Sequence, residues 1–146
     1  DKLSSVSSIY SVPDNGITVT SDYITPSMVP LVNLDQSDLD KIVGSVIGGG
    51  SNIQDIYPLS PLQEGIYFHH MMSDKNHGDL YILPSLLSFS DKEKRNSFIE
   101  ALQFVVSRHD VLRTCIKSEG LPTPVQVVLR EVTLYVEEIS LDDSKD

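Results

Sequence analysis

Residues 53–65 read IQDIYPLSPLQEG, and this stretch sets the fold of the chain around it. Its first half carries the apolar residues of a strand that ends near Leu59. Ser60 then offers a helix cap, and Pro61 suits the first helical position because that position needs no N–H donor. Gln63 completes a capping box with Ser60. The stretch therefore predicts a strand over 53–59 that turns directly into a helix running to about residue 73.

The predicted helix carries apolar residues at helical spacing, which indicate a face turned toward a core. That stripe comprises Leu62, Ile66 and Met72, with His69 or His70 beside them. Aromatic residues at such spacing usually pack, so Tyr57, Tyr67 and Phe68 are expected in the core as well.

A second informative stretch, RHDVLRT over residues 108–114, marks the passage from a helix into a strand. The helix begins at Ser90, which pairs with Glu93 as a capping box, while Asp91 adds favourable charge at the positive end. Apolar residues recur at helical spacing up to Val106. The pattern predicts a helix from Ser90 to about His109 and a strand over 111–117.

Three further strands complete the predicted set, over residues 80–89, 125–129 and 134–139. Pro84 places the first of them at an edge or a bulge. The order is strand, helix, strand, helix and then three strands, the last three most simply antiparallel. This order indicates an α/β or α+β fold.

The first 50 residues differ in character from the rest. Turn-forming residues are dense up to about residue 34, which is typical of a connector, although scattered apolar side chains suggest that it lies against a surface. A short helix is predicted over 35–44, capped by Asp35 and closed by Gly44. Residues 48–50 are three glycines, which we interpret as a flexible joint because no Lys-Ser/Thr pair follows as in a phosphate-binding loop.

Composition excludes several classes of function. The chain has 146 residues and a formal net charge of −10, which argues against binding to nucleic acid or to an anionic membrane. No apolar run is long enough to span a membrane, and no secretory signal is visible. Cys115, the single cysteine, fits a reducing cytoplasmic setting and is expected as a core thiol. The four histidines and this cysteine show no metal-binding spacing.

The two quoted stretches together resemble the first two core motifs of the condensation domains of nonribosomal peptide synthetases. PVQVV at 124–128 is similar to the strand that follows them in the family. Upstream, residues 24–26 and 35–42 resemble the linker that joins a carrier domain to a condensation domain. The resemblance implies part of a chloramphenicol-acetyltransferase-like lobe, a mixed sheet with helices packed on it. Residues 1–50 would be the linker, and 51–146 a truncated N-terminal part of the lobe.

The resemblance also implies an activity and partners. Condensation domains join aminoacyl or peptidyl groups held on phosphopantetheine arms, so the partners would be carrier domains and a neighbouring adenylation domain of one cytoplasmic synthetase. The domain itself would bind no cofactor. A histidine of the family motif HHxxxDG assists the attacking amine, largely through positioning.

Residues 69–74 read HHMMSD and imitate that motif, but Lys75 stands where its glycine belongs. The pair also lies within the first motif's helix, which would place His69 and His70 on different faces. The family's catalytic motif comes well after Arg113. We therefore expect no catalytic residue in this chain, with the motif beyond Asp146, and expect the chain alone to be inactive.

Family-specific roles fall to a few residues. Arg108, His109 and Arg113 are expected to be structural, with Arg113 buried and paired because a buried charge needs a partner. Arg108 could equally be a surface residue that closes its helix. Gln63 and Glu64 are candidates for lining the substrate tunnel, although capping already accounts for Gln63.

Two other functions stay open at this point. The chain could be a non-catalytic docking module that binds a carrier protein, or an unrelated small acyltransferase, for which no convincing catalytic histidine is present. Within the condensation family, the Gln-Glu-Gly sequence followed by His-His resembles domains that accept a D-configured donor, including dual epimerisation–condensation types. Exposed apolar side chains such as Leu86 and Phe104 would make the isolated chain poorly soluble.

Overall fold

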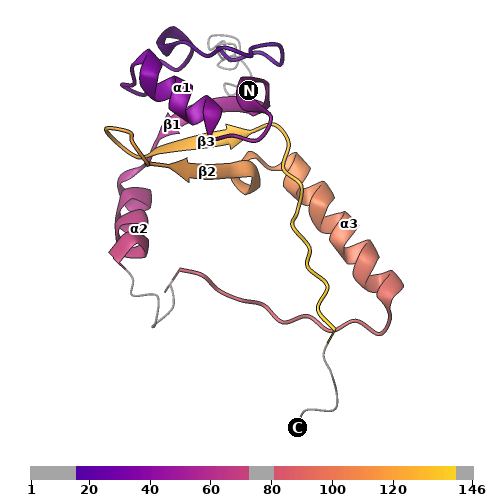
Figure 1. The fold of residues 1–146 in the computed structure, drawn as a ribbon. Helices are drawn as coiled ribbons and strands as arrows, with labels where there is room; N and C mark the ends of the chain where they lie inside the picture. Colours follow the sequence, from indigo (N-terminus) through magenta and orange to yellow (C-terminus); the bar gives the residue numbers. More distant parts are fainter. Residues whose placement is uncertain (1–15, 73–80, 141–146) are drawn as a thin grey trace, which may run out of the picture.

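The computed structural model describes residues 16–72 and 81–140 (Figure 1). Six helices and strands follow one another in these ranges: α1 (Gln36–Gly44), β1 (Ile53–Pro58), α2 (Pro61–Met72), α3 (Lys92–Arg108), β2 (Thr114–Lys117) and β3 (Val125–Leu129). Short 3-10 turns occupy Pro26–Met28, Gly49–Asn52 and Asp110–Arg113. The α/β class expected from the sequence is confirmed.

The three strands form one sheet in the order β1-β3-β2. Both pairings are antiparallel, whereas a mixed sheet was expected. The central strand β3 places Val127 between Ile56 of β1 and Cys115 of β2. Cys115 is half-buried and packs against the core, in agreement with its expected place.

One face of this sheet is covered by α1 and the residues before it (Figure 1). Leu39 and Ile42 of α1 are fully buried, and Asp35 caps the helix by accepting from the N–H of Asp38 at 2.9 Å. The buried cluster consists of Ile17, Ile24, Val29, Leu34, Leu39, Ile42, Val46, Ile53, Ile56, Val125 and Val127. Most of its members precede β1, so the segment expected to connect domains supplies much of the core under the sheet.

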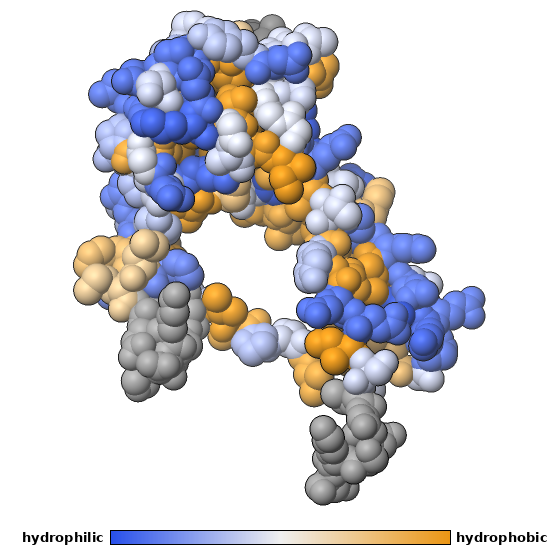
Figure 2. Space-filling view, in the orientation of Figure 1, coloured by the Kyte–Doolittle hydropathy of each residue, from blue (hydrophilic) through white to orange (hydrophobic). Residues whose placement is uncertain are grey.

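The helices α2 and α3 extend from the sheet on the side away from α1 (Figure 1). α2 has no buried residue, and Val106 is the single buried residue of α3. The expected core stripe of α2 was wrong: Leu62 and Met72 are 75% and 70% exposed, because no other described element covers that face. Figure 2 shows a hollow between the parts of the molecule that contain α2 and α3, and apolar side chains border it.

The aromatic residues expected in the core are also more exposed than predicted. Phe68 is 61% exposed, Tyr57 is 37% exposed and Tyr67 is half-buried. Each lies on or next to the side of the sheet that α1 does not cover. Packing of these rings therefore depends on what covers that side.

Two predicted strands are absent from the described residues. Residues 81–89 have no regular structure, and residue 80 lies outside the described ranges, as does the turn expected at 75–78. Residues 134–139 are not a strand either, and they contact α3 instead: Leu134 N–H donates to Gln103 Oε1 at 2.8 Å, and Glu138 pairs with Arg95 at 3.2 Å. A strand needs a neighbour for its hydrogen bonds, and β1, β2 and β3 pair with neither segment.

Two element boundaries also needed correction. The cap of α3 is Asp91, whose side chain accepts from the N–H of Lys94 at 2.9 Å, rather than Ser90. The strand expected from Val111 begins at Thr114, because Asp110–Arg113 forms a 3-10 turn first. By contrast, the capping box of α2 is confirmed: Ser60 N–H donates to Gln63 Oε1 at 2.9 Å and Gln63 N–H to Ser60 Oγ at 3.4 Å.

Candidate functional site

The corner between α3 and β2 holds a connected cluster of polar side chains. α3 ends at Arg108, and His109 caps it with an extended backbone whose N–H donates to the carbonyl of Val106. A single 3-10 turn follows, closed by the Thr114 hydroxyl, which donates to the carbonyl of Asp110 at 2.8 Å. The sequence RHDVLRT therefore folds as a helix end, a tight turn and a strand start.

Arg113 lies at the centre of this corner with only 7% of its surface exposed. Its Nη2 forms an ion pair with Asp110. Its Nη1 donates to Gln54 Oε1 at 3.3 Å, to the carbonyl of Arg130 at 3.1 Å, and to the carbonyl of Leu129. Burial of a guanidinium is costly unless it is paired and hydrogen-bonded. These acceptors engage both terminal nitrogens of Arg113, whereas its Nε has no hydrogen-bond partner among the described residues.

Gln54 joins this network from β1, the strand at the opposite edge of the sheet from β2. Its Nε2 donates to Asp110 Oδ2 at 3.0 Å, while its Oε1 accepts from Arg113. One amide thus bridges the two members of the ion pair. Three separate pieces of chain are joined here: β1, the turn before β2, and the end of β3. The arrangement fixes their relative positions and offers no acid–base pair for proton transfer.

Next to this network, Tyr57 donates its hydroxyl proton to Asp55 Oδ2 at 2.7 Å. This hydrogen bond to the carboxylate, helped by partial burial, raises the pKa of Tyr57 to about 12. The same carboxylate accepts from the N–H of Ile56 at 2.8 Å. Tyr57 is therefore a neutral hydrogen-bond donor near neutral pH.

The expected structural residues have different surroundings. Arg113 is buried and paired, and it alone of the three belongs to the network. Arg108 is exposed, with its guanidinium carbon 5.6 Å from the centre of the Phe104 ring. His109 contributes its backbone to the helix end and its carbonyl accepts from the N–H of Leu112. The structural role of each residue stays a prediction.

The expected tunnel residues open α2. Gln63 is half-buried and its amide pairs with that of Gln126 on β3: each Nε2 donates to the partner's Oε1, at 2.8 and 3.1 Å. Glu64, by contrast, is exposed. A contact between the hydroxyls of Tyr67 and Ser118 adds a second link between α2 and the sheet region.

The two histidines that imitate a catalytic motif lie in the last turn of α2, and both are exposed. The His69 ring contacts Phe68 edge to face and lies tilted beside Tyr81, with centroid separations of 5.9 and 6.4 Å. Asp74, the carboxylate of the imitated motif, lies outside the described residues.

Comparison with known proteins identifies the family. The model of the condensation domain matches residues 53–146, more than half of the chain. The chain belongs to the condensation domain family. It is 50% identical to Malpibaldin synthetase and 51% identical to Malpinin synthetase, both from Mortierella alpina, over 90% and 92% of its length. It is also 40% identical to a linear gramicidin synthase from Brevibacillus parabrevis, over 80% of its length.

These condensation-family alignments cover about 2% of each of the two Mortierella synthetases and 1% of the gramicidin synthase. They also reach further upstream than the family match, since 90% of the chain cannot be covered without residues ahead of Ile53. No solved structure matches the chain. Among the helices of the described ranges, none has the length and apolar character needed to cross a membrane.

Sequence reasoning missed two members of the network of this condensation domain. Asp110 belongs to the quoted motif, and its spacing of three residues from Arg113 is the signal that could have indicated an ion pair across one turn. Gln54 gave no such signal, because it contacts Asp110 across 56 residues of sequence. A lone glutamine in a strand reads as a surface residue until the strands are placed.

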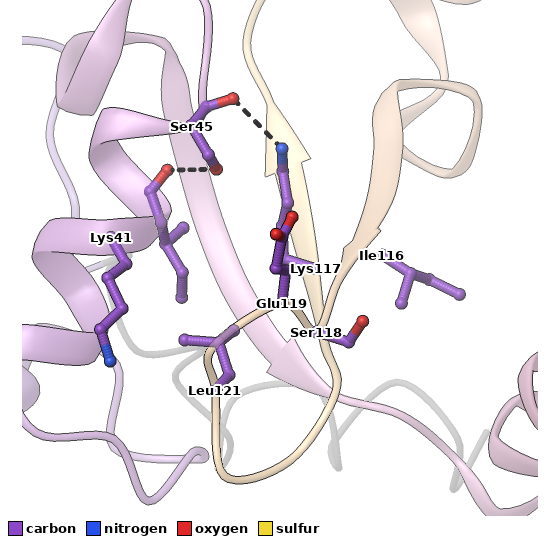
Figure 3. Close-up of a pocket in the computed structure, with 8 residues that line it drawn as sticks. Lys41, Ser45, Ile116, Lys117, Ser118, Glu119 and Leu121 are labelled. Atoms are coloured by element: carbon purple, nitrogen blue, oxygen red, sulfur yellow. Dashed lines mark hydrogen bonds between the residues drawn. The ribbon is translucent and has the colours of Figure 1, made fainter.

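A cleft of about 480 Å³ lies between α1 and the β2–β3 hairpin (Figure 3). Two lysines border it, and both amines have partners. Lys117 Nζ donates to the carbonyl of Ser45 at 3.2 Å. Lys41 Nζ donates to Asp38 at 3.0 Å and to the carbonyl of Gly120 at 2.9 Å. These lysines join α1 to the hairpin, so the cleft is a surface groove at the junction of these two parts.

Proposed function

We propose that this chain is part of a nonribosomal peptide synthetase condensation domain that forms a peptide bond between aminoacyl or peptidyl groups on phosphopantetheine carriers. The family match and the synthetase relatives support this proposal. The partners would be carrier domains and an adenylation domain of the same synthetase. The single half-buried cysteine is compatible with a reducing, cytoplasmic setting.

Within that domain, the described residues would supply a frame rather than the chemistry. The observation that carries this role is the buried Arg113, which ties β1, the α3–β2 corner and the end of β3 through Gln54, Asp110 and two carbonyls. Acyl transfer between two large carriers depends on positioning, and a fixed frame supplies it. We assign no catalytic residue to this stretch. The phosphopantetheine would belong to the carriers.

Of the two residues proposed to line the substrate tunnel, Gln63 and Glu64, only one has a side chain available to a substrate. The Gln63 amide is engaged on both its atoms, by Ser60 and by Gln126. Glu64 lies on the same helix turn with its carboxylate exposed. Glu64 is therefore the side chain of this pair that is available to a substrate.

The test is condensation by the intact synthetase. Donor and acceptor carriers are loaded with their aminoacyl groups, and the peptidyl product on the acceptor carrier is followed by mass spectrometry. We expect product from the parent protein and less from Arg113→Ala, with Arg108→Ala as the matched control. Loaded carriers that bind but yield no product would favour the docking module instead.

A further inference from the structure

The residues ahead of the family match are built into the core of the sheet. Ile24 and Val29 are 1% and 2% exposed, and Leu39 and Ile42 of α1 are 0% and 1% exposed. They pack against Ile53, Ile56, Val125 and Val127, all of which lie in the matched region. Removing apolar side chains from water is the main favourable contribution to folding, so separating this segment from the sheet would be strongly unfavourable.

Polar contacts hold the same segment at both of its ends. At the beginning, Arg130 Nη2 donates to the carbonyl of Ile17 at 2.9 Å, across 113 residues of sequence. Toward the end, Lys117 reaches the carbonyl of Ser45 and Lys41 reaches that of Gly120. Each contact joins the upstream segment to the β2–β3 region.

The backbone of the upstream segment approaches Gly50 very closely. A Cβ atom at Gly50 would lie 2.4 Å from the carbonyl oxygen of Asp22, which is far inside any ordinary contact. Both this glycine and the backbone around Asp22 would have to move to accept a side chain. At Gly44, by contrast, an added Cβ would meet nothing within 4 Å.

We propose that residues 17–46 form a permanently docked clasp, and that this clasp fixes the point at which the preceding polypeptide leaves the domain, at Gly16 rather than at Ile53. A free linker over residues 17–52 would have a root-mean-square reach of roughly 30–36 Å. Docking removes that freedom. If a carrier domain precedes the chain, as the proposed function requires, its tether starts beside Ile17, which Arg130 holds next to the end of β3.

The first test cuts the chain between the upstream segment and β1 and leaves the rest of the sequence unchanged. A protease recognition sequence is inserted between Gly48 and Gly49 in the 146-residue chain, which is kept soluble by a fusion partner at its C-terminus. After cleavage, we expect the two pieces to co-elute in gel filtration and to separate only in denaturant. Separation in native buffer, with the circular dichroism of the sheet preserved, would overturn the proposal.

Two matched substitutions sharpen this result. Gly50→Ala places a methyl group against Asp22, and such overpacking is destabilising. We therefore expect the cleaved pieces to associate about tenfold more weakly, which corresponds to about 1.4 kcal/mol. Gly44→Ala adds the same methyl group in open space and should leave association unchanged. Equal affinities for the two variants would contradict the clasp.

Hydrogen exchange on the uncleaved parent chain decides the matter if Gly50→Ala does not fold. We expect the amides of α1 to be protected to the same degree as those of β3, because both belong to one cooperative unit. Exchange of α1 at the rate of an unstructured peptide, with β3 protected, would show a free linker.

A second test addresses the functional consequence in the intact synthetase. A flexible Gly-Ser insertion between Gly48 and Gly49 should leave donor transfer from the preceding carrier unchanged, because the clasp stays docked. The same insertion ahead of Gly16 lengthens the tether and should lower transfer through a lower effective concentration. Equal effects at the two places would overturn the fixed exit point. If no transfer occurs in any version, the proposed function fails while the cleavage result still stands.

Discussion

Arg113 and Asp110 form an ion pair, with 2.5 Å between Nη2 and Oδ1, across the single 3-10 turn that leads into β2. The guanidinium is buried and the carboxylate is half-exposed, with side-chain exposures of 7% and 57%. Asp110 thus stays in contact with water while it neutralises the charge of Arg113, which has little contact with water. Gln54 bridges both partners, so the pair is anchored to β1 as well.

Replacing Arg113 should therefore destabilise the domain more than replacing Arg108. Arg113→Ala leaves the carbonyls of the β3 end and the Gln54 amide without their donor, and we expect a loss of about 3 kcal/mol in unfolding free energy. Arg108→Ala removes an exposed contact with Phe104, worth about 0.5–1 kcal/mol. Thermal unfolding of the complete domain measures both. Equal or reversed effects would remove the structural role from Arg113.

A lysine cannot substitute for this arginine. Nη1 and Nη2 point to acceptors on different segments, and a single ammonium group cannot reach all of them. We expect Arg113→Lys to recover less than half of the stability lost in Arg113→Ala, measured by the same unfolding experiment. Full recovery would mean that charge alone matters at this position.

Local patterns predicted the elements whose stability is decided locally. The capping box of Ser60 and Gln63 forms as expected because both groups lie within one helical turn. The strand over 125–129 was predicted with its observed bounds, since its apolar run is short and is bordered by turn residues. The Asp35 cap of α1 follows from the same kind of contact.

Patterns that depend on distant partners did not predict the structure. The segment 134–139 has the composition of a strand, yet it lies along α3, where Leu134 N–H donates to Gln103 and Glu138 pairs with Arg95. The network around Arg113 could be predicted only in part. Burial of an arginine implies that it has a partner, but does not identify that partner. Gln54 could be placed there only once β1 was paired with β3.

The position of the α3 cap leads to a second stability prediction. Asp91 accepts from the N–H of Lys94, and this hydrogen bond, together with one from the Ser90 hydroxyl, lowers the pKa of the Asp91 carboxyl. Asp91→Ala should therefore reduce the thermal midpoint and the helical circular dichroism more than Ser90→Ala does. A larger effect of Ser90→Ala would return the cap to the residue that the sequence pattern favoured.

The sign of the pH dependence follows from the direction of that shift. A carboxyl whose folded pKa lies below its unfolded value stabilises the fold above the unfolded pKa, near 4, and loses this contribution as the pH falls through the folded pKa. The difference in stability between the parent chain and Asp91→Ala should therefore shrink below about pH 4. A difference that is constant over this range would exclude a charged cap.

Tyr57 provides a test at the alkaline end. Its pKa is raised to about 12, above the usual value near 10, chiefly by its hydrogen bond to Asp55. Because the neutral form is favoured in the folded state, the stabilising contribution is fully present below pH 10 and is lost as the pH rises to about 12. Tyrosinate absorbance of the parent minus that of Tyr57→Phe should show a midpoint near 12. In Asp55→Asn the midpoint should move toward 10, and an unchanged midpoint would contradict the assigned cause.

His70 tests whether the HHMMSD sequence has any catalytic role. His69 and His70 are neighbours on an α-helix, so their side chains diverge by about 100° and cannot both face one reacting group. In the intact synthetase we expect His70→Ala to form peptide product within about twofold of the parent, with His69→Ala as the matched control. General acid–base catalysis is typically worth 10²–10⁴-fold, so a loss of that size in His70→Ala alone would make this imidazole the base and would overturn the assignment of a structural frame to this stretch.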